Sequence, residues 1–289
     1  MDKLKLLWYR LLSGGLIPAR WLYGDLLRGA EIQAHSGRLQ IEIVSHCWAY
    51  AHLQSYQLSS LLQHAPENAD ITMTVFHSEE DEITVRHLEF FGAQQRPGVT
   101  WNWQRLPREA LFRRAIGRDQ AARATTADWI WFTDCDLLFG PGCLDGLAAA
   151  LQGRRDRLVY PRTEYLSALL PDDDPVLAKE AEPRIKAIDL SGFAPHQPSR
   201  ATGPLQIVHG DIARHVGYCG QTPYFMQPVD RWAKTYEDRT FRWLINAQGS
   251  PIEVPAVYRI RHQSKGRYKD GIDSRLRRNI RLATDNRHH

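Results

Sequence analysis

The chain has 289 residues, of which 43% are hydrophobic and 24% are charged, so it can bury a large core and is not disordered overall. Its net charge of +4 and pI near 8.9 suit contact with phosphates or an anionic membrane surface, but the excess is too small for a dedicated nucleic-acid binder. The four cysteines (Cys47, Cys135, Cys143 and Cys219) form no Cys-x-x-Cys pair, which argues against structural zinc and is typical of free thiols in a reducing compartment.

The first 38 residues have a pattern of their own. Leucines and a tryptophan recur at helical spacing, Lys3, Lys5 and Arg10 take other positions, and the pattern resumes over 20–27 after a break at glycines and a proline. No uncharged run approaches the roughly 18 to 20 apolar residues of a membrane span, and no small-residue cleavage site follows. Two interpretations stay open: an amphipathic helix lying in a membrane interface, or a helix packed on the protein's own core.

From residue 39 the sequence alternates between strand and helix patterns. Strands are expected over 41–44 and 71–76, a helix over 50–63, and further strands from about 99 and 129. This spacing is typical of βαβ units and predicts an α/β fold with a doubly wound, mostly parallel sheet and flanking helices.

Polar residues follow the first two strands. Ser45 and His46 come after the first and His77 after the second, so all three are expected to rim the crevice at the carboxyl ends of the strands. For His77 and Glu79 the alternative is a helix cap beside an acidic first turn.

The segment 128–140 carries the main functional prediction of the sequence. A continuous apolar run over 129–132 indicates a strand buried on both faces, and Asp134 and Asp136 follow where that strand ends. Residues two apart on an extended chain point the same way, so both carboxylates are expected to converge on one cation, with oxygen ligands that suit Mg²⁺ or Mn²⁺. The alternative is two acids in a solvated turn.

The helix-like run 118–129 followed by Asp134-x-Asp136 resembles the GT-A glycosyltransferases, and family 2 in particular. The resemblance implies a GT-A fold and a metal-dependent enzyme that moves a sugar, with a UDP-sugar as the expected donor, to a glycan, lipid-linked or other hydroxyl acceptor. It also implies that Ser45 and His46 touch the nucleotide and that Arg118 and Asp119 meet the base or diphosphate. Gly117 and Asp119 have an alternative as the entry turn of a helix.

The acceptor half is expected after residue 160. A helix over 144–151 and a strand over 158–160 precede a proline-rich segment, 171–198, with Asp172, Asp173 and Asp174; we expect a mobile loop over the acceptor side. Residues 203–208 have strand character and lead into a helix.

Glu237 and Asp238 open a further helical pattern and resemble the Glu-Asp motif of inverting family 2 members. The resemblance implies that Asp238 is the catalytic base, that Glu237 orients the acceptor, and that transfer inverts the anomeric carbon. The alternative is a capped helix start, since the helix dipole favours acids in a first turn.

A last strand is expected over 252–260. His262 resembles the C-terminal histidine that completes the GT-A metal site, with Lys265 and Arg267 near the diphosphate. The expected division is therefore an amphipathic segment (1–38), a glycosyltransferase domain (39–270, with a nucleotide-sugar half over 39–160) and a basic tail (271–289).

We expect a cytoplasmic hexosyltransferase-like enzyme of glycan or glycoconjugate biosynthesis that contacts the inner face of the membrane and binds no nucleic acid. One alternative is a nucleotidyltransferase of similar fold, but residues 45–53 contain no glycine for its phosphate-binding loop. Another is a catalytically silent protein that binds sugar nucleotides or glycans, against which the intact acids at 134, 136, 237 and 238 count.

Overall fold

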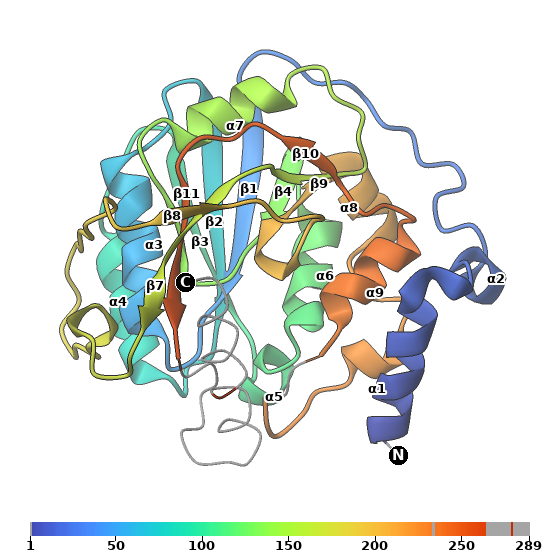
Figure 1. Ribbon diagram of the computed structural model, residues 1–289, viewed down its shortest axis with the longest axis horizontal. Helices are drawn as coiled ribbons and strands as arrows, with labels where there is room; N and C mark the ends of the chain where they lie inside the picture. The colour runs from blue at the N-terminus through green and yellow to red at the C-terminus, as the bar shows by residue number, and fades with distance from the viewer. Residues whose placement is uncertain (1, 233–234, 264–278, 280–289) are drawn as a thin grey trace.

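The structure is a computed structural model that describes residues 2–232, 235–263 and 279. Within these residues the centre is a seven-stranded sheet in the order β10-β6-β9-β4-β1-β2-β3 (Figure 1). Its strands are β1 (Leu39–His46), β2 (Ala69–His77), β3 (Val99–Arg105), β4 (Trp129–Phe132), β6 (Leu158–Pro161), β9 (Gln206–His209) and β10 (Ser250–Ile252). All neighbours run parallel except β9, which is antiparallel to both β4 and β6. The predicted α/β class and mostly parallel sheet are confirmed.

Helices cover both faces of this sheet, which explains its apolar centre. One face carries α3 (Ala51–Gln63) and α4 (Glu82–Gly92), and the other carries α6 (Arg114–Ala124), α8 (Gly210–Val216) and α9 (Glu237–Leu244) (Figure 1). Every residue of β4 is at most 1% exposed, as expected for a strand between two helical layers. The N-terminal cap of α4 is Asp81, which accepts from the backbone N–H of Thr84.

A second sheet, with four described strands, was not predicted. Its order is β5-β11-β7-β8, built from β5 (Leu137–Phe139), β7 (Glu164–Leu170), β8 (Ala194–His196) and β11 (Val257–His262). The expected single strand over 252–260 is wrong, because β10 pairs with β6 in the large sheet and β11 pairs with β5 and β7 in the small one. The Ile260 backbone N–H donates to the Asp136 carbonyl at 2.9 Å, which fixes the end of β11 beside the acidic turn.

Shorter elements complete the described chain. They are α5 (Arg108–Leu111), α7 (Cys143–Leu151), and the 3₁₀ turns η2 (Pro175–Leu177), η3 (Gly203–Leu205) and η4 (Pro223–Met226). The expected loop over 171–198 contains η2 and β8 and is held against α3, because the Lys186 backbone N–H donates to Ser59 Oγ at 2.8 Å and its carbonyl accepts from Gln63 Nε2 at 3.1 Å. Its expected mobility stays a prediction.

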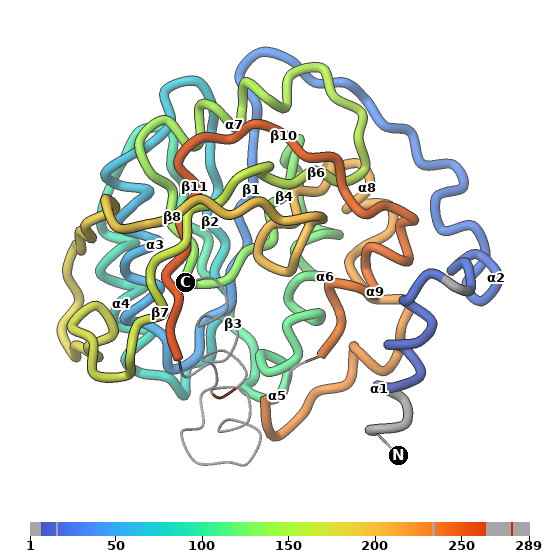
Figure 2. The backbone as a smooth tube through the Cα atoms, viewed as in Figure 1, coloured from blue at the N-terminus to red at the C-terminus, as the bar shows by residue number. Residues whose placement is uncertain are grey.

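The N-terminal segment packs on the domain by one side. It comprises α1 (Asp2–Leu11), η1 (Leu12–Leu16) and α2 (Arg20–Tyr23), and residues 24–38 then run along the outside of the molecule to β1 (Figure 2). Leu12 is 3% exposed, Tyr9 stacks on Tyr224, and Trp243 Nε1 donates to the Ile17 carbonyl at 2.6 Å. Packing on the core, one of the two interpretations left open by the sequence, is thus present on one side of the segment, and large apolar side chains on its other side are exposed.

Candidate active site

The acidic residues predicted for the site lie at one edge of the large sheet. The turn that follows β4 carries Asp134 and Asp136 at the carboxyl end of that strand. Because β9 is antiparallel, its first residue rather than its last lies at this edge: Gln206 pairs with Phe132. The 3₁₀ turn that precedes β9 therefore lies at this edge, and the first turn of α9 joins it, because Gln206 Nε2 donates to the Asp238 carbonyl at 3.0 Å.

One guanidinium joins the two acidic motifs. Arg114 Nη1 lies 2.5 Å from Asp134 Oδ1, and its Nε lies 3.2 Å from Glu237 Oε1. Arg118, one turn further along α6, places Nη2 3.6 Å from the same Asp134 oxygen. Sequence reasoning missed Arg114, although its i, i+4 spacing from Arg118 puts both on one face of a helix and was the signal available.

Asp136 forms a separate pair. Its Oδ2 lies 3.9 Å from His262 Nε2, both side chains are at most 7% exposed, and the ring of Tyr50 lies 5.8 Å from that of His262. A carboxylate and an imidazole are suitable Mn²⁺ ligands. Among the described residues, however, no three His, Cys, Asp or Glu side chains are arranged to hold a metal, and Asp134 contacts Arg114. The carboxylate of Asp136 and the imidazole of His262 are thus suitable ligands for a cation. Asp134 is oriented toward an arginine in this structure.

Glu237 and Asp238 diverge at the start of α9, as expected for adjacent helical residues. The Glu237 side chain is 3% exposed and faces Arg114, whereas that of Asp238 is 31% exposed, with Oδ2 3.5 Å from Arg242 Nη1. A Cβ built on Gly203 would lie 3.8 Å from Asp238 Cβ, so Asp238 stands beside the turn that enters β9. Of the two acids, Asp238 is therefore the more accessible.

Arg118 and Asp119 connect several segments at this edge of the sheet through hydrogen bonds. Arg118 is fully buried and donates to Tyr218 Oη at 2.8 Å and to the Thr133 and Gly203 carbonyls at 3.3 Å each. Asp119 Oδ1 accepts from the backbone N–H groups of Tyr218 and Gly220, and its Oδ2 pairs with Arg123 at 2.9 Å. These contacts give both residues a positioning role, and their expected contact with the donor stays a prediction.

The predicted crevice residues of β1 and β2 are also buried. Ser45 Oγ donates to Gln54 Oε1 at 3.2 Å, and His46 stacks on Phe76 with ring centroids 4.9 Å apart. A Cβ on Gly117 would lie 2.3 Å from His46 Nε2, so α6 approaches this ring through a glycine. Burial lowers the pKa of His77, which favours its neutral form.

Lys265 and Arg267 lie outside the described residues. Their expected place near the diphosphate stays a prediction.

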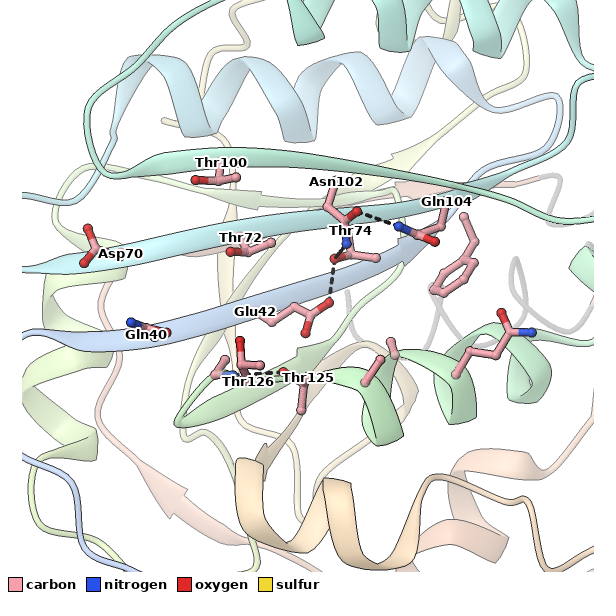
Figure 3. Close-up of a pocket in the computed structure, with 15 residues that line it drawn as sticks. Gln40, Glu42, Asp70, Thr72, Thr74, Thr100, Asn102, Gln104, Thr125 and Thr126 are labelled. Atoms are coloured by element: carbon pink, nitrogen blue, oxygen red, sulfur yellow. Dashed lines mark hydrogen bonds between the residues drawn. The ribbon is translucent and has the colours of Figure 1, made fainter.

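A cavity of about 490 Å³ lies elsewhere, on the faces of β1, β2 and β3 beside α6 (Figure 3). Its side chains form a hydrogen-bonded row: Gln104 donates to Asn102 at 2.6 Å, Asn102 to Thr74 at 2.9 Å, and Thr74 to Glu42 at 2.5 Å. Burial raises the pKa of Glu42. None of the predicted site residues lines this cavity, so it is distinct from the acidic crevice.

The cysteines differ in exposure. Cys47, Cys143 and Cys219 are buried, and Cys135, between the two acids of the turn, is half-buried. Burial also raises the pKa of Cys219, which keeps that thiol protonated.

Comparison with known proteins supports the resemblance seen in the sequence. Residues 99–169 match the family model described as "Glycosyl transferase family 2", and this segment contains Arg114, Arg118, Asp134 and Asp136. The chain resembles the family 2 glycosyltransferases. No curated protein sequence matches it.

Among solved structures, a mannosyltransferase from Pyrobaculum calidifontis, in complex with GDP-Man and Mn²⁺, is similar at 19% identity and a TM-score of 0.44. The match covers 99% of this chain and 74% of that one. The family match and the mostly parallel sheet together support a glycosyltransferase with a GT-A fold. No helix among the described residues is long and apolar enough to cross a membrane.

Proposed function

We propose that this family 2-like protein transfers a hexosyl group from a nucleotide-diphosphate sugar to an acceptor hydroxyl, with inversion and with help from Mn²⁺ or Mg²⁺, in glycan or glycoconjugate biosynthesis. The observation that carries the proposal is the Arg114 bridge. It brings an acid of the Asp-x-Asp turn and an acid of α9 within reach of one guanidinium, although 103 positions separate Asp134 from Glu237 in the chain. The two acidic motifs thus share one guanidinium, as the proposed reaction requires.

The chain supplies positive charge where a diphosphate would leave. The guanidinium groups of Arg114 and Arg118 lie on the same face of α6, directed toward Asp134. When a divalent cation is bound, Asp136 and His262 would hold it, and it would neutralise charge that develops on the leaving diphosphate. We propose a UDP-sugar as the donor.

The two acids of α9 have different surroundings and therefore different roles. Glu237 is buried and ion-paired with Arg114, so its carboxylate is committed to the inner part of the crevice. Asp238 is one-third exposed and stands beside Gly203, where an acceptor hydroxyl has access. We assign proton removal from the acceptor to Asp238 and acceptor orientation to Glu237.

The proposal is tested with Asp238→Asn, which keeps the shape and hydrogen-bonding capacity of the side chain but removes its basicity. Turnover should fall about 100-fold or more with donor binding little changed, because general base catalysis contributes on that scale. The assay uses a panel of nucleotide sugars including UDP-glucose and GDP-mannose, with Mn²⁺ and with EDTA. The exposed Asp230→Asn serves as a control at full activity.

Three results would count against the proposal. They are near-normal turnover of Asp238→Asn, full activity of the wild type in EDTA, and an NMR spectrum showing that the product keeps the donor's anomeric configuration. The first result would contradict the assignment of Asp238 as the base. The second would contradict the need for a cation, and the third would contradict inversion.

A further inference from the structure

A second cavity, of about 770 Å³, lies between the N-terminal segment and α9. Five described arginines line it, against one acid, Asp25: Arg20, Arg157, Arg200, Arg239 and Arg242. They come from four separate parts of the chain, so the fold, and no local charge run, gathers them. Such a concentration of one charge sign favours an anion.

Most of this charge is uncompensated inside the protein. Arg239 Nε donates to the Ser13 carbonyl at 3.0 Å and Arg157 Nη1 to the Ile245 carbonyl at 3.3 Å, so both side chains are held in place by backbone groups. Four of the five arginines form no ion pair with a described residue: Arg20, Arg157, Arg200 and Arg239. Guanidinium groups bind phosphate oxygens through paired N–H donors, which makes phosphate the anion of choice.

The N-terminal segment that borders this cavity also carries exposed apolar side chains, which we call the apolar ridge. Of the seven large hydrophobic side chains that are prominently exposed in the described chain, five belong to the N-terminal segment: Leu7, Trp8, Leu11, Trp21 and Leu22, at 50% to 71% exposure. Trp21 and Leu22 directly follow Arg20, which lines the cavity. In Figure 1, α1 and α2 stand at the outer side of the molecule beyond α9. Exposed tryptophan and leucine next to arginine are typical of a surface that enters a membrane interface.

We propose that the arginine cavity binds the phosphate headgroup of an anionic membrane lipid while the apolar ridge enters the adjoining interface. The charge of the cavity selects the headgroup, and the ridge distinguishes a lipid from a soluble phosphate. Arg242 lines the cavity and also contacts Asp238, so docking there places the assigned base within one helical turn of the lipid surface. The docked face is then the one that meets a lipid-linked acceptor, a step that rests on the proposed function.

The test is sedimentation of the full chain with vesicles of phosphatidylcholine, with and without phosphatidylglycerol, in the absence of any sugar donor. Arg20→Gln/Arg200→Gln removes two exposed cavity charges that make no hydrogen bond among the described residues. Arg28→Gln/Arg155→Gln removes the same charge from two exposed arginines outside the cavity. The cavity pair should weaken binding to phosphatidylglycerol vesicles about tenfold or more and the control pair about threefold or less, since each arginine at the surface contributes about a factor of five.

A second arm separates lipid from free phosphate. Trp21→Ser should weaken vesicle binding several-fold, and soluble glycerol phosphate should compete only weakly. Equal losses in the two double variants, or no sedimentation of the wild type, would overturn the proposal. Tight binding of glycerol phosphate with no effect of Trp21→Ser would assign the cavity to a soluble ligand and also overturn it. Because no turnover is measured, these outcomes are independent of whether the sugar transfer occurs as proposed.

Discussion

Arginines gather in two regions of this molecule, and their bonding differs. In the acidic crevice Arg114 contacts Asp134 and Glu237, and Arg118 donates to a phenol and two carbonyls while facing Asp134. In the cavity under the N-terminal segment, the side chains of Arg20 and Arg200 make no hydrogen bond or ion pair with a described residue. Arginines paired within the protein fix its geometry, whereas unpaired ones gathered in a cavity leave their donors for a ligand.

The largest effect is expected for Arg118→Met, which removes a fully buried cation and its three hydrogen bonds. Removing one partner from a buried network costs about 3 to 5 kcal/mol, so the free energy of unfolding in urea should fall by that amount. Arg123→Met, whose side chain is 46% exposed and pairs only with Asp119 among the described acids, should cost less than about 1 kcal/mol. A small loss for Arg118→Met would mean that the crevice does not depend on its paired arginine.

Arg114→Gln should have an intermediate effect. It leaves Asp134 and Glu237 without their shared counter-charge, and hydrogen bonds to charged groups are worth about 1.5 to 3 kcal/mol, reduced here because Arg114 is 24% exposed. We therefore expect a loss of about 1 to 2 kcal/mol in urea unfolding, together with a fall in turnover. The matched variant Arg105→Gln, which breaks an exposed pair with Glu79, should change neither quantity appreciably. Normal turnover of Arg114→Gln would separate the bridge from catalysis.

The smallest effect on the free energy of unfolding is expected when arginines of the cavity are replaced. Arg20→Gln/Arg200→Gln should change the free energy of unfolding by no more than about 0.5 kcal/mol, with a slight gain favoured because two like charges are removed. Urea unfolding at low ionic strength gives the value. A loss above about 1 kcal/mol would show that these arginines support the fold and would remove the contrast between the two regions.

The sequence predicted the donor half of the fold well because local pattern and tertiary structure agree there. The run over 129–132 is apolar throughout and does form a strand buried on both faces, and the helix expected over 50–63 is α3. The small sheet escaped prediction because β5 and β8 have only three residues each and all four strands pair with distant segments. Val257 lies opposite Phe139, for example, and nothing within either segment specifies the other.

The site was predictable in its acids but less so in its arrangement. The divergence of Glu237 and Asp238 follows from helix geometry alone. In contrast, Asp119 accepts hydrogen bonds from the backbone of Tyr218 and Gly220, which lie 99 to 101 positions further along the chain, so its sequence neighbours do not predict them. The orientation of Asp134 toward Arg114 was missed because the spacing of Arg114 and Arg118 marks one helix face but does not specify which acid that face meets.

The half-buried thiol of Cys135 has a practical consequence for this crevice. The other three cysteines are buried, and burial raises the pKa of Cys143 and Cys219, so their thiols resist alkylation. A mild alkylating reagent would therefore modify the turn between Asp134 and Asp136 first. Peptide mass spectrometry of the unaltered protein can follow that modification as substrates are added, so occupancy of the crevice becomes visible without an introduced label.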